Sequence, residues 1–354
     1  MNKREFLETI SARVAGLPAE EQTRLMEYFS ELIDDRVELG MDEAAAVAAL
    51  GDPEALLRDI APAALPAVQE RDARGSGDDW SEAIREIHIH LRNGDGTIRR
   101  GALPGGMTAQ ISASSGNRFT WRLEDGVLTI AEAEQARRGI IFQRGADLTL
   151  TLSDFEAECL IADSYGGNIE VVGVATALRT VLASSTGDIQ LTDCGCHGRM
   201  EITTRSGDIA LTGIDAEADC KLETLSGDIE LNRVNAGRLR GRTASGDVDG
   251  RGLRAGALAF GTTSGDIELE DAAAESTMLC ETASGDIDLM DADGADVRLS
   301  TASGDVTLRL LGRPEGYDVQ ASSRSGEIEI RGSVPNGAPV RVQTGSGDIE
   351  VKAL

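Results

Sequence analysis

Residues 224–231 have the sequence TLSGDIEL, and close copies of this stretch recur throughout residues 161–354. The tripeptide Ser/Thr-Gly-Asp, followed by Ile or Val, returns at intervals of 19 to 22 residues, with Gly-Gly-Asn and Ser-Gly-Glu as variants. A fixed period of this length is typical of solenoid proteins. The glycines of the copies are Gly167, Gly187, Gly207, Gly227, Gly246, Gly265, Gly285, Gly304, Gly326 and Gly347.

Polar and apolar residues alternate on both sides of each glycine. The second and fourth positions after it are aliphatic, as in Ile229 and Leu231, with Gly250 as the exception. The position between them is usually polar, as in Glu230. Before the glycine, the third position back is a threonine in most copies, as in Thr224, and the fifth is apolar. Alternation with a period of two indicates a strand with one face turned inward.

No single repeat can bury its apolar positions alone, whereas stacked repeats bury them against each other. We therefore predict a mainly β protein: a right-handed parallel β-solenoid of about ten rungs of 19–22 residues. The glycine suits a corner that needs positive φ or a close backbone approach. Residues 81–160 are β-rich without the glycine register and predict an irregular start, followed by the regular solenoid over 161–354. A β-propeller is the alternative, but its blades need about 40 residues.

The repeated T-x-S-G-D-I-x-L pattern resembles the bacterial "putative adhesin" β-strand-repeat family, a domain of unknown function, over roughly residues 84–354. Members of that family are often tied to envelope-stress and cell-surface systems. The resemblance implies a β-strand repeat fold and names no reaction.

Residues 1–60 predict a small all-α domain of short helices, and residues 61–80 read as a linker. The segments KREFL at 3–7, LPAEE at 17–21, GMDEA at 40–44 and LGDP at 50–53 resemble the HAAS-type helical domain of bacterial membrane and signalling proteins. The resemblance implies an interaction or regulatory module that binds a protein partner. A simple helical cap or oligomerisation handle is the other interpretation.

Composition restricts the partners and the compartment. Among 354 residues only 11 are aromatic, 41 are Gly and 61 are Asp or Glu, and the formal net charge is −27. This charge argues against binding nucleic acid or an anionic membrane surface. No apolar stretch approaches the roughly 18 residues of a membrane-spanning helix, and the opening residues do not resemble a secretory signal. Five cysteines favour reduced thiols. We expect a cytoplasmic protein that reaches the membrane only through a partner.

An acidic residue follows the glycine of nearly every repeat. These carboxylates face outward and stack about 4.8 Å apart, where two unit charges repel by roughly 0.9 kcal/mol in water. Either each Asp accepts backbone hydrogen bonds at its corner, which we favour, or the row forms weak Ca²⁺ or Mg²⁺ sites. No other cofactor is indicated. The row consists of Asp188, Asp208, Asp228, Asp247, Asp266, Asp286, Asp305, Glu327 and Asp348.

No catalytic arrangement can be recognised in the sequence. Cys194, Cys196 and His197 look like part of a metal site, but a closed zinc site needs four ligands, and inward thiols are the better interpretation. Only three histidines are present. We therefore predict a non-enzymatic, acidic scaffold for protein–protein interaction, plausible in envelope-stress signalling. The alternative is a cation-dependent β-helix that binds or cleaves carbohydrate.

The last repeat carries an expectation about assembly. Its inward residues Val342, Ile349 and Val351 are as apolar as those of internal rungs, although the sequence ends soon after them at Leu354. An uncovered terminal coil leaves strand edges unpaired. We therefore expect the C-terminal coil to pair with a second copy in a two-fold homodimer.

Overall fold

The computed structural model describes residues 3, 6–7, 84–103, 108–114, 119–132 and 146–354. The chain divides into two compact units, Met1–Glu70 and Arg71–Leu354. Apart from Lys3 and residues 6–7, the predicted helical domain of residues 1–60 lies outside the described residues, as does the linker of 61–80. In the described part of the chain, no helix has the length and apolar character needed to cross a membrane.

The described residues of the second unit form 22 strands. The strands of its first part are β1 (Glu86–Leu91), β2 (Gly96–Arg100), β3 (Ala109–Ala113), β4 (Phe119–Glu124), β5 (Val127–Glu132), β6 (Leu148–Leu152) and β7 (Ala157–Ser164). The regular repeats form β8 (Ile169–Val172), β9 (Ala175–Ser184), β10 (Ile189–Thr192), β11 (Gly195–Cys196), β12 (Arg199–Thr203), β13 (Ile209–Glu223), β14 (Ile229–Arg242), β15 (Val248–Gly261), β16 (Ile267–Glu281) and β17 (Ile287–Ser303). The C-terminal part holds β18 (Val306–Leu310), β19 (Tyr317–Ser325), β20 (Ile328–Arg331), β21 (Ala338–Ser346) and β22 (Ile349–Ala353).

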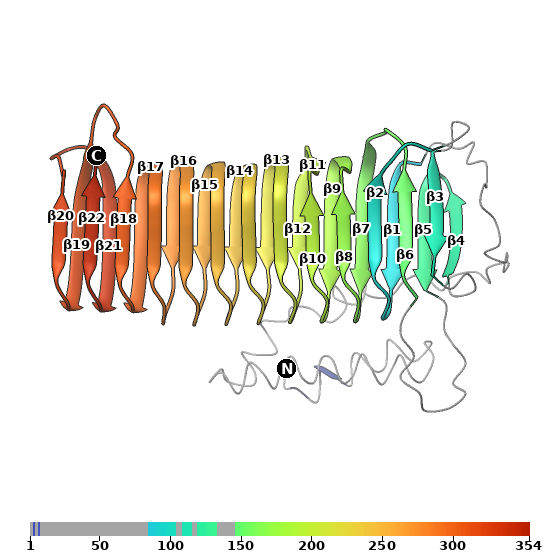
Figure 1. Ribbon diagram of the computed structural model, residues 1–354, viewed down its shortest axis with the longest axis horizontal. Helices are drawn as coiled ribbons and strands as arrows, with labels where there is room; N and C mark the ends of the chain where they lie inside the picture. The colour runs from blue at the N-terminus through green and yellow to red at the C-terminus, as the bar shows by residue number, and fades with distance from the viewer. Residues whose placement is uncertain (1–2, 4–5, 8–83, 104–107, 115–118, 133–145) are drawn as a thin grey trace. The chain divides into compact units, whose positions relative to one another are not determined.

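The regular repeats pair in parallel, each residue beside its equivalent in the next repeat. Ile209 lies beside Ile229, and Leu211 beside Leu231. Figure 1 shows the resulting row of strands between β4 at one end and β20 at the other. The predicted β-solenoid is confirmed, while its handedness stays a prediction.

Each coil has three straight segments. In β13 the first, Ile209–Thr212, follows the glycine corner and ends at Gly213, whose φ is 66°. A short second segment ends in a register shift after Ala216, and the third leads through Cys220 to Thr224. We name these segments face 1, face 2 and face 3. From Gly167 to Gly285, the turn position six residues after the repeat glycine is left-handed in every repeat, at Gly173, Asp193, Gly213, Arg233, Gly252, Asp271 and Asp291.

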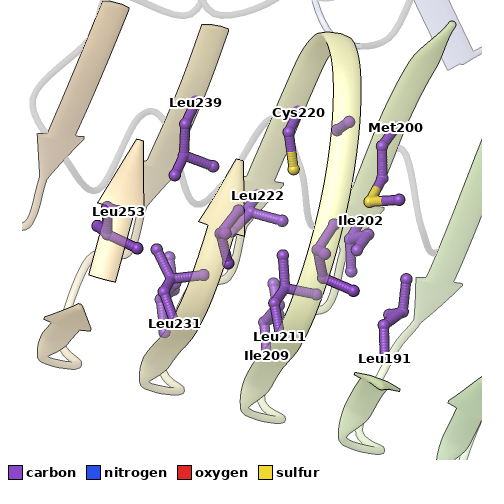
Figure 2. Packing of buried hydrophobic residues seen from close by; sticks show 14 of the residues in the cluster. Leu191, Met200, Ile202, Ile209, Leu211, Cys220, Leu222, Leu231, Leu239 and Leu253 are labelled. Carbon is purple, nitrogen blue, oxygen red and sulfur yellow. The ribbon is translucent and has the colours of Figure 1, made fainter. Parts of the chain in front are cut away.

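The interior is filled by the predicted aliphatic columns. Ile229 is fully buried and Leu231 is 4% exposed, whereas Glu230 between them is exposed. Figure 2 shows buried apolar side chains stacked from coil to coil, with Leu191, Leu211 and Leu231 in one column. The predicted inward parity is therefore confirmed. Since few aromatic residues are available, the core relies on the stacking of like on like.

The glycine corner is held by close backbone approach. A Cβ atom added to Gly246 would lie 2.0 Å from the carbonyl oxygen of Gly227, far inside any normal contact. Beside it, the buried hydroxyl of Thr243 donates to Gly227 O at 2.9 Å and accepts from the Gly246 N–H at 3.1 Å. Equivalent threonines repeat the first contact along the solenoid, so a buried polar column ties each coil to its neighbour.

At the N-terminal end, the order of the coils in space differs from their order in the chain. β1 pairs in parallel with both β5 and β7, and β2 with both β6 and β8. The first strands of the unit thus lie inside the stack. The end is closed by β4 and β3, which pair antiparallel with β5 and β6. Antiparallel strands of the same chain therefore cover this end of the solenoid.

The C-terminal end contains the same exchange of order, and it overturns the predicted open edge. β21 pairs with both β17 and β19, and β22 pairs with both β18 and β20. Val342, Ile349 and Val351 are therefore internal, at most 1% exposed. The prediction that they form the edge is wrong, because the repeat pattern fixes which residues face inward but not the order in which equivalent coils stack. The last strands in space are β19 and β20.

The segment of residues 311–316 carries the chain past one coil, from β18 to β19. It is anchored where it enters β19: the hydroxyl of Tyr317 donates to Asp293 Oδ1 at 2.9 Å, and Arg313 pairs with the same carboxylate. Burial, followed by the contact with Asp293, raises the pKa of Tyr317. These contacts hold the displaced coil in its place.

Candidate binding face

The predicted acidic row forms a hydrogen-bonded ladder along the glycine corner. In each step the backbone N–H of one acidic residue donates to Oδ1 of its equivalent in the adjacent coil. The ladder continues past the predicted row: the Asp188 N–H donates to the amide oxygen of Asn168, and the Asn168 N–H donates to Asp95 Oδ1, both at 2.8 Å. The steps, 2.7–3.0 Å long, link Asn168, Asp188, Asp208, Asp228, Asp247, Asp266, Asp286, Asp305, Asp348 and Glu327 in this spatial order.

The ladder corresponds to the first of the two interpretations of the acidic row, in which the carboxylates accept backbone hydrogen bonds. One oxygen of each aspartate is engaged by the neighbouring coil, which leaves the other facing solvent. In the described ranges, no three or more His, Cys, Asp or Glu side chains gather in an arrangement suited to a metal ion. The acidic row therefore contributes hydrogen bonds that hold neighbouring coils together.

A second acidic column lies on face 1, two residues further along each strand. It consists of Glu230, Asp249, Glu268 and Asp288, which are direct neighbours on β14 to β17. Within the described chain, no Lys, Arg or His forms an ion pair with any of these four side chains. We call this set the acidic column.

The acidic column lines a groove of about 630 Å³ on the outer side of face 1. Gly250 lies in the floor, at the one position where the repeat lacks its second aliphatic residue. A Cβ atom there would lie 2.7 Å from both Leu253 and Leu269, so the neighbouring leucines fill the inward space. Arg251 and Arg309 border the groove, but each is paired, to Glu270 and Asp291.

The electrostatics of the acidic column are unfavourable in the free protein. Partial loss of hydration, and then the carboxylates of Asp247, Asp228 and Asp266, raise the pKa of Asp249. Loss of hydration and the charges of Asp249 and Asp288 likewise raise the pKa of Glu268. Both side chains are exposed, so the groove walls remove only part of their hydration. A cationic group placed here would relieve repulsion that the fold leaves uncompensated.

A groove of the same volume, about 630 Å³, lies on face 2, and its charges are largely satisfied. Arg254 pairs with Asp271, Arg313 with Asp293, and Glu217 with His197 at 2.8 Å. Asp215 and Glu275, which also line it, have no ion pair among the described residues, but they do not form a continuous column like that of face 1.

Comparison with known protein families shows which family the solenoid resembles. A family model described as Toastrack DUF4097 matches residues 84–249 and, overlapping them, residues 224–353. The two matches extend over more than half of the 354 residues. The chain belongs to the Toastrack DUF4097 family. A second model, HAAS, matches residues 5–59, in line with the N-terminal resemblance seen in the sequence.

Two solved structures are similar to this Toastrack chain. One is described as a "putative adhesin" from Bacteroides fragilis NCTC 9343, with 12% sequence identity and a TM-score of 0.37, covering 77% of this chain and 93% of that chain. The other, a "putative cell adhesion protein" from Clostridium sporogenes ATCC 15579, has 10% identity and a TM-score of 0.25, covering 78% and 95%. No curated protein matches the chain.

Four cysteines of the Toastrack solenoid, among them the predicted inward Cys194, Cys196 and Cys280, pack as small apolar residues, and Cys159 is partly exposed. Cys194 and Cys196 are 5% and 2% exposed, and all five thiols are free. Burial raises the pKa of Cys220 and that of Cys280 to about 12, which keeps both protonated at neutral pH. His197, beside Cys196, points instead to Glu156 and Glu217 on the surface.

The sequence alone did not single out the acidic column. Its members appear in the repeat as ordinary outward residues, mixed with Gln190, Ala210 and Thr307 at equivalent positions. The available signal was an acidic residue at the same position of four consecutive repeats, one of which also carries Gly250. Only the in-register pairing of β14 to β17 shows that these four form one uninterrupted surface.

Proposed function

We propose that the protein is a non-enzymatic scaffold whose acidic groove binds a basic segment of a partner protein. The observation that carries this proposal is the acidic column: four adjacent carboxylates that have no cationic partner among the described residues and line a groove on the sheet. Lysine or arginine side chains of a partner would lie between carboxylates that now repel each other. Binding would then be strengthened by relief of that repulsion.

The arrangement of the other polar groups supports a scaffold. The aspartate row and the threonine column are both spent on contacts between coils. The regular repeats offer the same groups at every level, whereas enzyme sites depend on a unique local grouping. The acidic groove departs from this uniformity by charge and shape alone, which suits binding.

A defined peptide tests the proposal. A ten-residue lysine peptide should bind the full chain in 150 mM NaCl, measured by isothermal titration calorimetry. Neutralising Asp249, Glu268 and Asp288 to their amides should weaken binding at least tenfold. The matched control neutralises Glu170, Glu275 and Glu281, which removes the same charge elsewhere, and should change affinity less than about twofold. Equal losses in both variants would reduce the effect to general attraction by net charge and refute the groove.

We further propose that residues 5–59, which match the HAAS model, contact a second partner protein, and that the protein acts in envelope-stress signalling from the cytoplasmic side. The support is the kind of system in which similar bacterial proteins occur. Fractionation of the native cells should find the chain in the cytoplasm and in the salt-extractable membrane fraction. Recovery from the outer surface or the medium would contradict this location.

A further inference from the structure

The last strand of the solenoid in space exposes residues that the repeat elsewhere buries. Ile328 and Ile330 on β20 are 43% and 37% exposed, while their neighbours on β22, Ile349 and Val351, are 1% and 0% exposed. Val334, which follows β20, is 45% exposed. Among the described strands, β20 pairs with β22 on one side and with none on the other.

The backbone of β20 is also open on that side. The Ile349 N–H donates to Glu327 O, so the polar groups of Glu327 point toward β22. Since successive residues of a strand direct these groups to opposite sides, those of Ile328 and Ile330 point to the free edge. The edge thus offers two donors and two acceptors next to two exposed isoleucines.

We propose that β20 pairs antiparallel with β20 of a second copy of this chain, which makes a two-fold dimer through the C-terminal end of the solenoid. Antiparallel pairing already closes the other end of the solenoid, where β3 pairs with β6 and β4 pairs with β5. Parallel continuation would generate a filament, but antiparallel pairing of identical edges closes on itself.

One register lets both outward-pointing isoleucines of β20 pair with the same strand of the second copy. Placing Ile328 opposite Ile330 of the second copy puts both isoleucines in hydrogen-bonded positions, which completes four backbone hydrogen bonds. The same register sets Arg331 opposite Glu327 of the second copy, twice over, and Glu329 opposite Glu329, where each of these two carboxylates is already paired with Arg331 of its own strand. Shifting it so that Ile328 faces its own equivalent would set Glu327 against Glu329 twice, with no arginine opposite either, and like charges opposite each other are destabilising. Pairing Ile330 with its own equivalent would set Arg331 opposite Glu329, but it would place Ile328 opposite Gly332, beyond the end of β20. Charge and backbone therefore favour the same partner, a second copy.

Size-exclusion chromatography with light scattering tests the proposal on the full chain. The wild type should be a dimer at about 50 μM. I330K should be a monomer, because the lysine would face the apolar surface of the second copy. The matched control is L225K, which replaces an exposed apolar side chain in a corner away from the edge and should remain a dimer. Circular dichroism should show unchanged folding in both variants, since both positions are exposed.

Charge exchange tests the register. E327R and R331E should each raise the dimer dissociation constant at least tenfold, and the double variant E327R/R331E should bring it back to within about threefold of wild type. A wild-type monomer at 50 μM would overturn the proposal. A dimer that persists in I330K would overturn it too, by placing the contact elsewhere, and a double variant as weak as the single ones would refute the register.

Discussion

The backbone N–H of Asp266 donates to the Oδ1 atom of Asp247 in the adjacent coil, at a distance of 2.8 Å. The contact makes a surface carboxylate part of the structure that joins two coils. Its repetition places like charges at the spacing of the coils, where each pair repels by roughly 0.9 kcal/mol in bulk water. Asn168 provides the same acceptor without the charge. The ladder therefore needs an oxygen acceptor at each level and does not need its negative charge.

Substitution of Asp247 separates these two properties. D247N should leave the free energy of unfolding unchanged or slightly higher, because the amide oxygen accepts from Asp266 as Asn168 does from Asp188. D247A should lower it by about 1 kcal/mol, the usual net value of a lost hydrogen bond. Urea denaturation at pH 7 measures both. An asparagine as costly as alanine would mean that the charge itself is required, as a cation-binding row would demand.

The threonine column should be more sensitive, because its hydroxyl groups are buried. T243V keeps the shape of the side chain but leaves the carbonyl of Gly227 and the N–H of Gly246 without their partner, and should cost about 1–3 kcal/mol. T243S should cost less, since Ser184 makes the equivalent two contacts in a coil nearer the N-terminal end of the solenoid. Equal costs for both variants would show that packing of the methyl group, and not the hydroxyl, stabilises the corner.

The repeat glycine should tolerate no side chain. In G246A the new Cβ would overlap the carbonyl of Gly227, so the two coils must separate and the threonine contact must break; we expect a loss of at least about 3 kcal/mol. Gly195 on β11 is the control, because a Cβ atom there meets its nearest neighbour, Asp215 O, at 3.8 Å. G195A should change the melting temperature by no more than a few degrees. A stable G246A would refute close approach as the reason for this glycine.

The sequence predicted the coil well and the stacking order poorly, and the two outcomes have one cause. Alternation at Ile229, Glu230 and Leu231 reports which side of a strand is buried, and this is a local property. Every coil presents the same pattern to both neighbours, so nothing in the repeat distinguishes β21 from β19 as the partner of β17. The exchange at the C-terminal end depends on the length of the connection at 311–316 and on the anchoring of Tyr317 by Asp293, which only the structure reveals.

The candidate site shows the same limit. The acidic row could be read from the sequence because each member follows a recognisable glycine, and its hydrogen bonding was one of the two alternatives that the sequence left open. The acidic column could not be read from the sequence, because it differs from other outward acidic residues only in having no ion pair among the described residues. Arg251 lies on β15 and Arg309 on β18, both close to the column, and only the structure shows that they pair with Glu270 and Asp291. Which charged side chains form ion pairs between coils depends on the direction that each side chain takes.

The raised pKa values of Asp249 and Glu268 give the acidic column a test in the free protein. A carboxyl group whose pKa is higher in the folded than in the unfolded state favours folding when protonated and opposes it when ionised. Stability from these two groups is therefore lost as pH rises through their unfolded and then their folded pKa values. The double variant D249N/E268Q should melt at a higher temperature than wild type at pH 7. The difference should vanish as pH falls to about 3, where both carboxyl groups are largely protonated in either state.

Glu350 supplies a control of opposite sign at the equivalent position of another coil. Its hydrogen bond and charge interaction with Lys352 lower the pKa of its carboxyl group, so its ionised form favours folding above the unfolded pKa. E350Q should therefore melt at a lower temperature than wild type at pH 7, and this deficit should also disappear in acid. Melting curves by differential scanning calorimetry between pH 3 and 8 measure both variants. Shifts of the same sign in the two would show that hydration or packing of the outer face, and not charge, determines the response, and the acidic column would lose its basis as a site for cationic partners.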